Sequence, residues 1–357
     1  MSKNGGLHRS QINAEAMGAL RRGAAFPAHP LALNAKREFD RESQRALSRY
    51  YIDAGSSGLA VGVHSTQFQI RDVGLYRPVL ELAAETAQDW TSRKLFMIAG
   101  VIGRTDQAVQ EARTARSLGY NAVLLGLAAF KGAGEDELVA HCATIAEEMP
   151  VIGFYLQTAV GGIKLSRKFW ARFAAIDNVI AIKVAPFNRY RTLDVAFGIA
   201  AAGAEDRVTL YTGNDDHIVL DLLVPLAIRT GNREVTLRFK GGLLGHWSVW
   251  TTGAVELLGR VHKAVADGPL TGEMLKLDSY VTDCNAVVFD VEHDFAGCIP
   301  GCHEILRRQG LMETNFCLDP HEVLSPGQAE EIDRLYRTYP EWTDDRFVAE
   351  NLARWRA

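Results

Sequence analysis

Lys183 is the residue whose position in this sequence best suits covalent chemistry. It ends the apolar run 179–182, which predicts a strand, so we expect its amine at the mouth of a sheet or barrel. Because burial disfavours the charged form of an amine, a desolvated lysine has a lowered pKa and can attack a carbonyl carbon to form a Schiff base. The simpler alternative is a lysine that extends to solvent or pairs with a carboxylate.

Tyr155 ends the preceding apolar run along the chain, at the equivalent position. A phenol hydroxyl there can move protons while a carbonyl compound bound to Lys183 becomes an imine. Taken alone, a tyrosine after an apolar strand is more commonly a packing residue. The occurrence of both residues at the ends of successive predicted strands favours a catalytic pair.

Other residues near the ends of predicted strands are expected to line the same site. His64 is predicted to take part in catalysis, because the usual pKa of histidine, about 6.5, suits acid–base work; the alternative is a histidine that only hydrogen-bonds a loop. The residues predicted to bind substrate are Ser65, Thr66, Gly213, Asn214 and His246. Asp215 and Asp216 are expected instead to cap the helix that follows them.

Eight short apolar segments recur along the chain, with helical stretches between them. They span residues 31–34, 58–63, 96–100, 122–126, 151–155, 180–183, 209–212 and 242–246. From the second segment onward their starts lie about thirty residues apart, which is the length of a strand, a loop and a helix. Eight such units favour a closed (β/α)8 TIM barrel, an α/β fold whose active site lies at the carboxyl ends of the strands. A doubly wound open sheet shares the rhythm, but the G-x-G-x-x-G segment expected after its first strand is missing.

The chain is expected to be one elaborated barrel rather than two domains. Residues 1–26 are interpreted as a flexible N-terminal arm, residues 27–252 as the catalytic barrel, and residues 253–357 as a C-terminal helical region. Inside the barrel, Ser166 is predicted to cap a helix, and the segment 325–328 is predicted to open a helix in the C-terminal region through a capping box.

Composition and charge exclude several classes of protein. Of 357 residues, 47% are apolar and 23% charged, and 39 basic against 43 acidic residues give a net charge of −4, which argues against a nucleic-acid-binding protein. No apolar run reaches the roughly 18 residues needed to span a bilayer, and the polar N-terminus lacks the pattern of a secretory signal. Five sparse cysteines indicate reduced thiols in a cytoplasmic protein, and their spacing matches no standard zinc site, so no metal is expected.

The predicted strand ends lie in segments that resemble the dihydrodipicolinate synthase and N-acetylneuraminate lyase family of Schiff-base aldolases. The segments are 99–100 with the helix that runs to Gly119, 122–126, 150–155, 178–183 and 212–215. By this resemblance, Lys183 matches the imine-forming lysine and Tyr155 matches the tyrosine that relays protons. The resemblance also implies a (β/α)8 barrel, a homo-oligomer such as a tetramer built from dimers, and chemistry on a small molecule that needs no organic cofactor.

The sequence departs from the family pattern at positions that handle substrate or protons. The family's Gly-Thr-Thr-Gly-Glu, which holds a keto-acid carboxylate, aligns with residues 63–67, where Ser65 can still donate a hydroxyl. The second relay tyrosine aligns with Phe130, and the arginine that grips a second carboxylate aligns with Val160. Condensation of aspartate semialdehyde is therefore not expected, and we hypothesise that His64 replaces part of the lost relay.

The sequence thus predicts a Schiff-base lyase or aldolase. Lys183 would attack the ketone of a 2-oxo acid such as pyruvate, and the resulting imine would accept electrons while a neighbouring C–C bond breaks or forms. Two alternatives stay open. One is an imine-dependent dehydratase or decarboxylase of a sugar-acid-like substrate, and the other is a barrel that binds a metabolite without turning it over.

Overall fold

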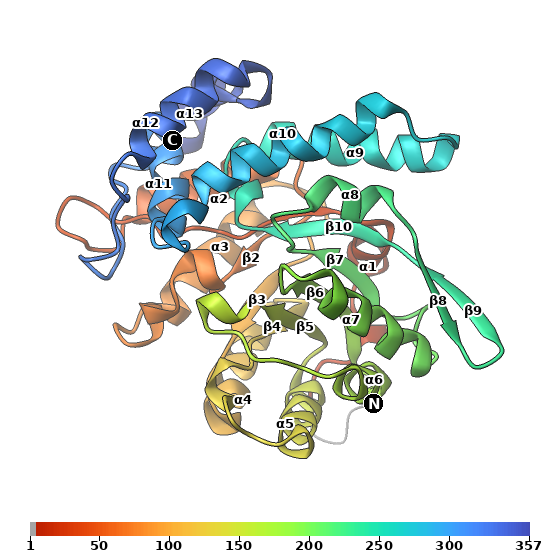
Figure 1. Ribbon diagram of the computed structural model, residues 1–357. Helices are drawn as coiled ribbons and strands as arrows, with labels where there is room; N and C mark the ends of the chain where they lie inside the picture. Colours follow the sequence, from red (N-terminus) through yellow and green to blue (C-terminus); the bar gives the residue numbers. More distant parts are fainter. Residues whose placement is uncertain (1–4) are drawn as a thin grey trace. The chain divides into compact units, whose positions relative to one another are not determined.

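The computed structural model of the protein describes residues 5–357 and has the predicted (β/α)8 TIM-barrel fold (Figure 1). Eight parallel strands alternate with helices along the chain. They are β1 (Ala25–Pro27), β2 (Ala60–Val61), β3 (Ile98–Val101), β4 (Ala122–Leu125), β5 (Val151–Leu156), β6 (Val179–Ala185), β7 (Thr209–Thr212) and β10 (Phe239–Leu244). Every segment predicted as a strand except the first overlaps one of them.

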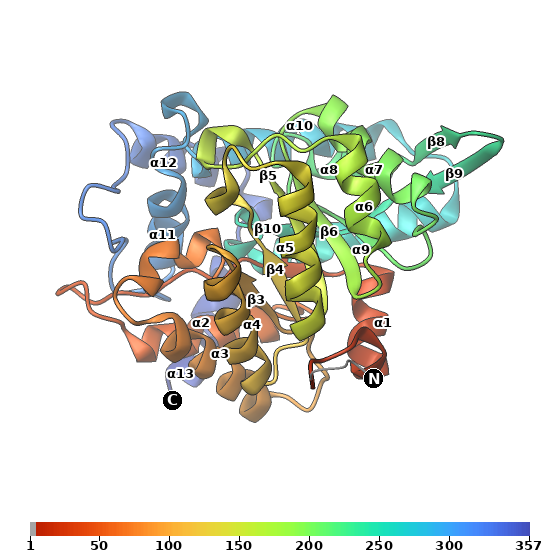
Figure 2. The same cartoon turned by 90° about the horizontal axis from the view of Figure 1, so that it is seen from below.

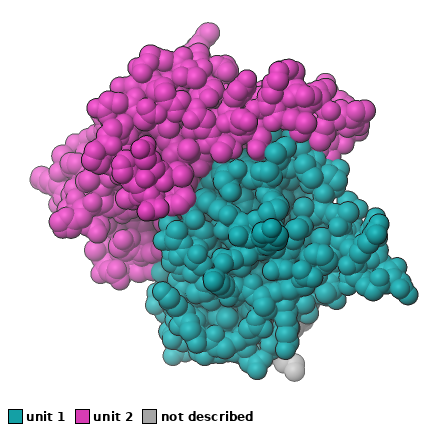
Figure 3. Space-filling model, in the orientation of Figure 1, with its two compact units in different colours: residues 1–23, 96–242 teal, residues 24–95, 243–357 magenta. Residues whose placement is uncertain are grey.

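The chain forms two compact units (Figure 3). The first unit consists of the residues up to 23 together with 96–242, and the second consists of 24–95 together with 243–357. Each unit is therefore built from two separate stretches of sequence.

The first unit contains a parallel sheet in which neighbouring strands follow the order β3-β4-β5-β6-β7-β10. These strands are buried along almost their whole length, as expected when helices cover a parallel sheet. The helices that cover one face of it (Figures 1 and 2) are α4 (Thr105–Ser117), α5 (Glu135–Glu148), α6 (Arg167–Ala175) and α7 (Arg189–Ala201). In α4, the buried residues Ala108, Ala112 and Ala115 recur at helical spacing, so one apolar face meets the sheet.

Helix α6 begins where the sequence predicts it. Ser166 caps it, because its hydroxyl oxygen accepts a hydrogen bond from the amide of Phe169 (Oγ to N, 3.1 Å). Helices α6 and α7 then approach closely: a Cβ added to Gly198 of α7 would lie only 2.5 Å from Cβ of Trp170 in α6, so this position requires glycine. The cap and the close contact together fix Trp170 against the sheet.

The second unit contains β1, β2 and the last residues of β10. Ala28 forms a parallel bridge with Ala60, and its amide donates to the carbonyl of Leu244 (3.3 Å), so the chain after β1 lies between the ends of β2 and β10. The helices of this unit are α2 (Arg41–Asp53), α3 (Tyr76–Trp90), α9 (Thr251–Asp267), α10 (Gly272–Val288), α11 (Cys298–Arg308), α12 (Gln328–Thr338) and α13 (Asp345–Arg356). Helix α12 follows the segment 325–328, but the predicted capping box is wrong. The helix begins at Gln328, its N-cap is Gly327 without a side-chain cap hydrogen bond, and the hydroxyl of Ser325 donates to Asp290 instead.

The first strand is not where the sequence predicts it. The predicted segment 31–34 is a loop, and β1 lies at Ala25–Pro27 instead. Leu31, Ala32 and Leu33 are completely buried, so their apolar character reflects the packing of an irregular segment rather than a strand.

A β-hairpin in the first unit was not predicted. After the short helix α8 (Ile218–Leu223), strands β8 (Leu226–Thr230) and β9 (Arg233–Leu237) pair antiparallel and extend outward (Figure 1). The hairpin lies between two predicted strands that are already about one βα period apart, so the period alone does not reveal it.

The N-terminal segment belongs to the first unit. Residues Ala14–Arg22 form helix α1, in which Leu20 is buried and accepts a hydrogen bond through its carbonyl from the hydroxyl of Tyr211 (2.7 Å). Before α1, the guanidinium of Arg9 pairs with the carboxylate of Asp177 (2.9 Å).

Within residues 5–357, no helix is long and apolar enough to cross a membrane. All five cysteines are buried free thiols.

Candidate active site

Lys183 lies on β6, and its side chain is almost completely buried, with 8% of the residue exposed. Its partners across the sheet are Phe154 of β5 and Tyr211 of β7. The Lys183 ammonium nitrogen lies 4.4 Å from the centre of the Phe154 ring, in the geometry of a cation–π contact. The aromatic face thus replaces part of the water that a buried amine loses.

Gly213 follows β7 and leaves room for the lysine. A Cβ at this position would lie 2.7 Å from Cε of Lys183 and 2.9 Å from Cβ of Ala185, closer than carbon atoms normally approach. The amide of Gly213 is held by the carbonyl of Val184 (2.8 Å). Of the residues predicted to bind substrate, Gly213 is therefore the one that the structure brings against Lys183.

Asp215, two residues further on, is buried with 6% exposure, and within the described part of the chain its Oδ1 has no hydrogen-bond partner. The expectation that it caps a helix is wrong, because the N-cap of α8 is His217. Burial raises the pKa of Asp215 to about 8, although Lys183 lowers it; the charge of Asp216 adds to the rise. An acid group that can hold its proton near neutral pH thus interacts electrostatically with Lys183.

Asn214 holds the loop after β7 in place. Its Oδ1 accepts from the amide of Phe187 (3.1 Å), and its Nδ2 donates to the side chains of Thr192 (3.2 Å) and Asp221 (2.9 Å). Asp221 is in turn paired with Arg189 (2.6 Å). Because these bonds occupy the Asn214 amide, its predicted contact with substrate would require some of them to break.

Tyr155 does not lie beside Lys183. At the start of the two strands Val151 pairs with Val179, and a constant register would pair Tyr155 with Lys183. However, β6 contains one extra residue between the partners of Val151 and Ile152, so Tyr155 pairs with Val184 instead. Because successive side chains of a strand point to opposite faces, Tyr155 and Phe154 face opposite sides of the sheet.

On its own face, Tyr155 packs against Trp170 of α6, with ring centres 5.1 Å apart. Its hydroxyl donates to the carbonyl of Leu165 (3.2 Å) and accepts from the amide of the same residue (3.3 Å). Burial raises the pKa of the phenol. The proton relay that the sequence predicts for Tyr155 stays a prediction, and it would require the hydroxyl to leave Leu165.

His64, Ser65 and Thr66 belong to the second unit, where they form the 3-10 turn η2 (His64–Thr66) after β2. The Thr66 hydroxyl donates to the carbonyl of His29 (2.7 Å) and accepts from two amides at the end of β2, so its hydrogen-bonding capacity is used within the turn. Ser65 is buried, and the ring of His64 meets Phe68 edge-on at 5.8 Å.

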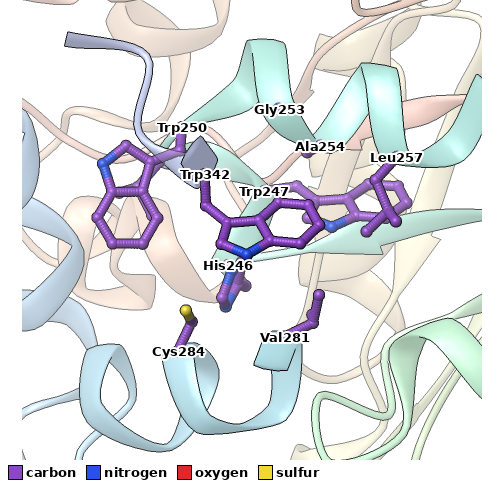
Figure 4. Close-up of a pocket in the computed structure, with 10 residues that line it drawn as sticks. His246, Trp247, Trp250, Gly253, Ala254, Leu257, Val281, Cys284 and Trp342 are labelled. Carbon is purple, nitrogen blue, oxygen red and sulfur yellow. The ribbon is translucent and has the colours of Figure 1, made fainter. Parts of the chain in front are cut away.

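His246 also belongs to the second unit and lines a pocket there. Trp247, Trp250 and Trp342 surround this pocket together with Cys284 of α10 (Figure 4). The His246 ring is hydrogen-bonded to Asn285 (3.2 Å), and burial lowers its pKa to about 4. His246 is therefore a neutral imidazole in an aromatic pocket at neutral pH.

Of the predicted site residues, the first unit thus brings together Lys183 and Gly213. It adds two groups that the sequence reasoning did not assign to the site, Phe154 and Asp215. Both are sequence neighbours of predicted site residues, since Phe154 directly precedes Tyr155 and Asp215 directly follows Asn214. Within residues 5–357, no cluster of His, Cys, Asp and Glu could hold a metal ion.

Comparison with known proteins gives consistent matches. Residues 23–226 match the model of the dihydrodipicolinate synthetase family. A 4-hydroxy-tetrahydrodipicolinate synthase from Desulforudis audaxviator is 26% identical over 62% of this chain and 72% of that protein, and N-acetylneuraminate lyase 2 from Escherichia coli O6:H1 is 20% identical over 86% and 90%. A dihydrodipicolinate synthase crystal structure from Aquifex aeolicus matches with a TM-score of 0.72 at 18% identity, over 90% of this chain and 99% of that one.

Proposed function

The chain belongs to the dihydrodipicolinate synthetase family, and from this premise we propose that it is a lyase that forms a Schiff base between Lys183 and a 2-oxo acid of the pyruvate type. The observation that carries the proposal is the position of Lys183, a buried amine on β6 whose side chain packs so closely against residue 213 that only glycine fits there. An imine on this nitrogen would accept electrons from a bond next to the former carbonyl, so that a C–C bond could break or form.

We also propose that the reaction is not the condensation of aspartate semialdehyde. Phe130 stands where the resemblance expects a second relay tyrosine, and its ring is buried against His141 (4.3 Å between ring centres), so no hydroxyl is available there. Val160 stands where an arginine for a second carboxylate is expected. These losses favour a substrate with a single carboxylate.

Borohydride trapping tests the function directly. The protein is incubated with pyruvate and sodium borohydride, which reduces an imine to a stable amine, and the product is measured by intact mass and peptide mapping. We expect an adduct on Lys183 and none in Lys183→Ala. The matched control is Lys168→Ala, which removes an exposed lysine of α6 and should leave the adduct unchanged.

A panel of 2-oxo acids then separates the alternatives. Release of pyruvate and an aldehyde from a 4-hydroxy-2-oxo acid indicates aldol cleavage, whereas loss of water or carbon dioxide indicates a dehydratase or decarboxylase. No adduct with any acid of the panel would overturn the proposal and favour a barrel that binds a metabolite without reaction.

A further inference from the structure

Asp215 is a buried acid that the reaction outlined above does not use. Its Oδ1 has no hydrogen-bond partner among the residues that the structure describes, and the residue does not cap the following helix. Burying a polar atom without a partner destabilises a fold, so such a group in a native protein calls for an explanation. The charged groups that act on it are Lys183 of β6 and Asp216, its neighbour in the loop.

The face of the sheet that carries Lys183 needs a group that can exchange protons. Lys183 has two partners across the sheet, Phe154 of β5 and Tyr211 of β7. Phe154 has no such group, and the hydroxyl of Tyr211 donates to the carbonyl of Leu20 (2.7 Å). The hydroxyl of Tyr155 is bonded to Leu165 on the opposite face. Asp215 is an ionisable group that interacts electrostatically with Lys183, and its Oδ1 has no hydrogen-bond partner among the described residues.

We propose that Asp215 transfers the protons of the Schiff-base reaction at Lys183, an inference that rests on the function proposed above. Once Lys183 Nζ has bonded to C2 of the 2-oxo acid, the protonated carboxyl of Asp215 gives its proton to the C2 hydroxyl. The C2–O bond breaks, water leaves, and the nitrogen lone pair forms the C=N bond. The Asp215 carboxylate then removes a proton from C3, so that the C3–H electrons form a C2=C3 bond and the C=N electrons return to nitrogen.

This assignment agrees with the electrostatics of the loop. Because burial and Asp216 raise the pKa of Asp215 to about 8 against the opposing effect of Lys183, the carboxyl can act as an acid at neutral pH. After it has lost its proton, its negative charge attracts the positive charge on the imine nitrogen of Lys183, which stabilises the intermediate.

Hydrogen exchange at the methyl group of pyruvate tests the proposal without knowledge of the natural substrate. The exchange in deuterated water requires imine formation followed by removal of the C3 proton, and NMR measures its rate. We expect Asp215→Asn to slow the exchange by about 100-fold or more. Given time, the borohydride adduct on Lys183 should still form in this variant.

The pH profile distinguishes proton transfer from a merely structural role. In the unmodified protein, exchange should fall above about pH 8, where Asp215 loses the proton that it must donate. Asp215→Asn should lose this alkaline fall. In the control Asp216→Asn exchange should persist, with the fall displaced to lower pH, because a charge that raises the pKa of Asp215 has been removed.

Each outcome decides between the two proposals. If the unmodified protein forms no adduct, the Schiff-base function itself fails. If it forms the adduct but Asp215→Asn exchanges at the same rate or keeps the alkaline fall, the role of Asp215 is disproved. Circular dichroism shows whether Asp215→Asn folds; if it does not, Asp215→Glu must retain exchange with a displaced alkaline fall, and an unchanged profile would disprove the role.

Discussion

Among single residues, Gly213 determines where the amine of Lys183 lies. Since a methyl group at 213 would come within 2.7 Å of Lys183 Cε, we expect Gly213→Ala to displace the amine. A displacement of about 1 Å lowers catalysis by roughly 100-fold, while the overpacking costs about 1–3 kcal/mol of stability. The rate of borohydride trapping measures the first effect and urea unfolding the second.

The control for this variant is Gly134→Ala, in the same unit. A Cβ there meets no atom within 4 Å, so the trapping rate should not change. Equal trapping rates in Gly213→Ala and the unmodified protein would contradict the steric explanation.

His64 gives a second test among single residues. If it relays protons, His64→Gln should lower the maximal rate of pyruvate methyl exchange by about 100-fold and leave the pyruvate concentration for half-maximal rate nearly unchanged. Gln keeps hydrogen-bonding capacity but cannot titrate near neutral pH. An unchanged maximal rate would restrict His64 to holding the turn η2.

The place of Lys183 on a buried strand could be predicted from the sequence, but the residues beside it could not. Lys183 could be predicted because an apolar strand that ends in a lysine is a local pattern. The prediction for Tyr155 assumed a constant register between two strands, and one extra residue in β6 breaks that register. A shift of one residue moves every later side chain of a strand to the other face, so Phe154 rather than Tyr155 lies beside Lys183. The spacing of the apolar runs does not reveal such a shift.

Among the elements, helix α6 offers a direct test of capping. Ser166→Ala removes the side-chain acceptor for the amide of Phe169, which should destabilise the first unit by about 1 kcal/mol. Ser117→Ala, at the exposed end of α4, is the control and should have a smaller effect. Urea midpoints measure both, and an unchanged midpoint in Ser166→Ala would show that the cap is dispensable.

The predicted elements are accurate where residues close together in the sequence determine them. Helix α6 begins where its capping serine places it, and the long buried strands β5 and β6 stand out by their apolar runs. Strand β1 has only three residues, and its sequence, Ala-Phe-Pro, carries little strand signal. The loop that follows β1 is more apolar, and its residues Leu31, Ala32 and Leu33 are completely buried. The strand was therefore predicted in this loop instead of at β1.

At the scale of the whole molecule, buried histidines should make the fold sensitive to mild acid. Burial lowers the pKa of several histidines to about 4, namely His29, His141, His246 and His303. In the unfolded chain they take up protons near pH 6.5, so the unfolding free energy should fall between about pH 6.5 and 4, by up to about 1.4 kcal/mol per pH unit for each histidine. Above pH 6.5 this contribution is complete.

Urea unfolding at several pH values measures this dependence. A constant unfolding free energy between pH 7 and 5 would mean that these imidazoles are not kept neutral by the fold.

The family resemblance also leads to a prediction about assembly. We propose that the chain forms a homo-oligomer, so light scattering should give a molar mass that is a multiple of 39.3 kDa. A mass of one chain at micromolar concentration would contradict this.

The division of the chain into two discontinuous units has a consequence for its synthesis on the ribosome. Residues 24–95 emerge early, but the rest of their unit begins at residue 243. The other unit needs only residues up to 242, so it can be complete while the early segment still lacks its partners. Until translation is nearly finished, apolar side chains of α2 and α3 that are buried in the folded protein stay exposed in the nascent chain, where a chaperone would bind.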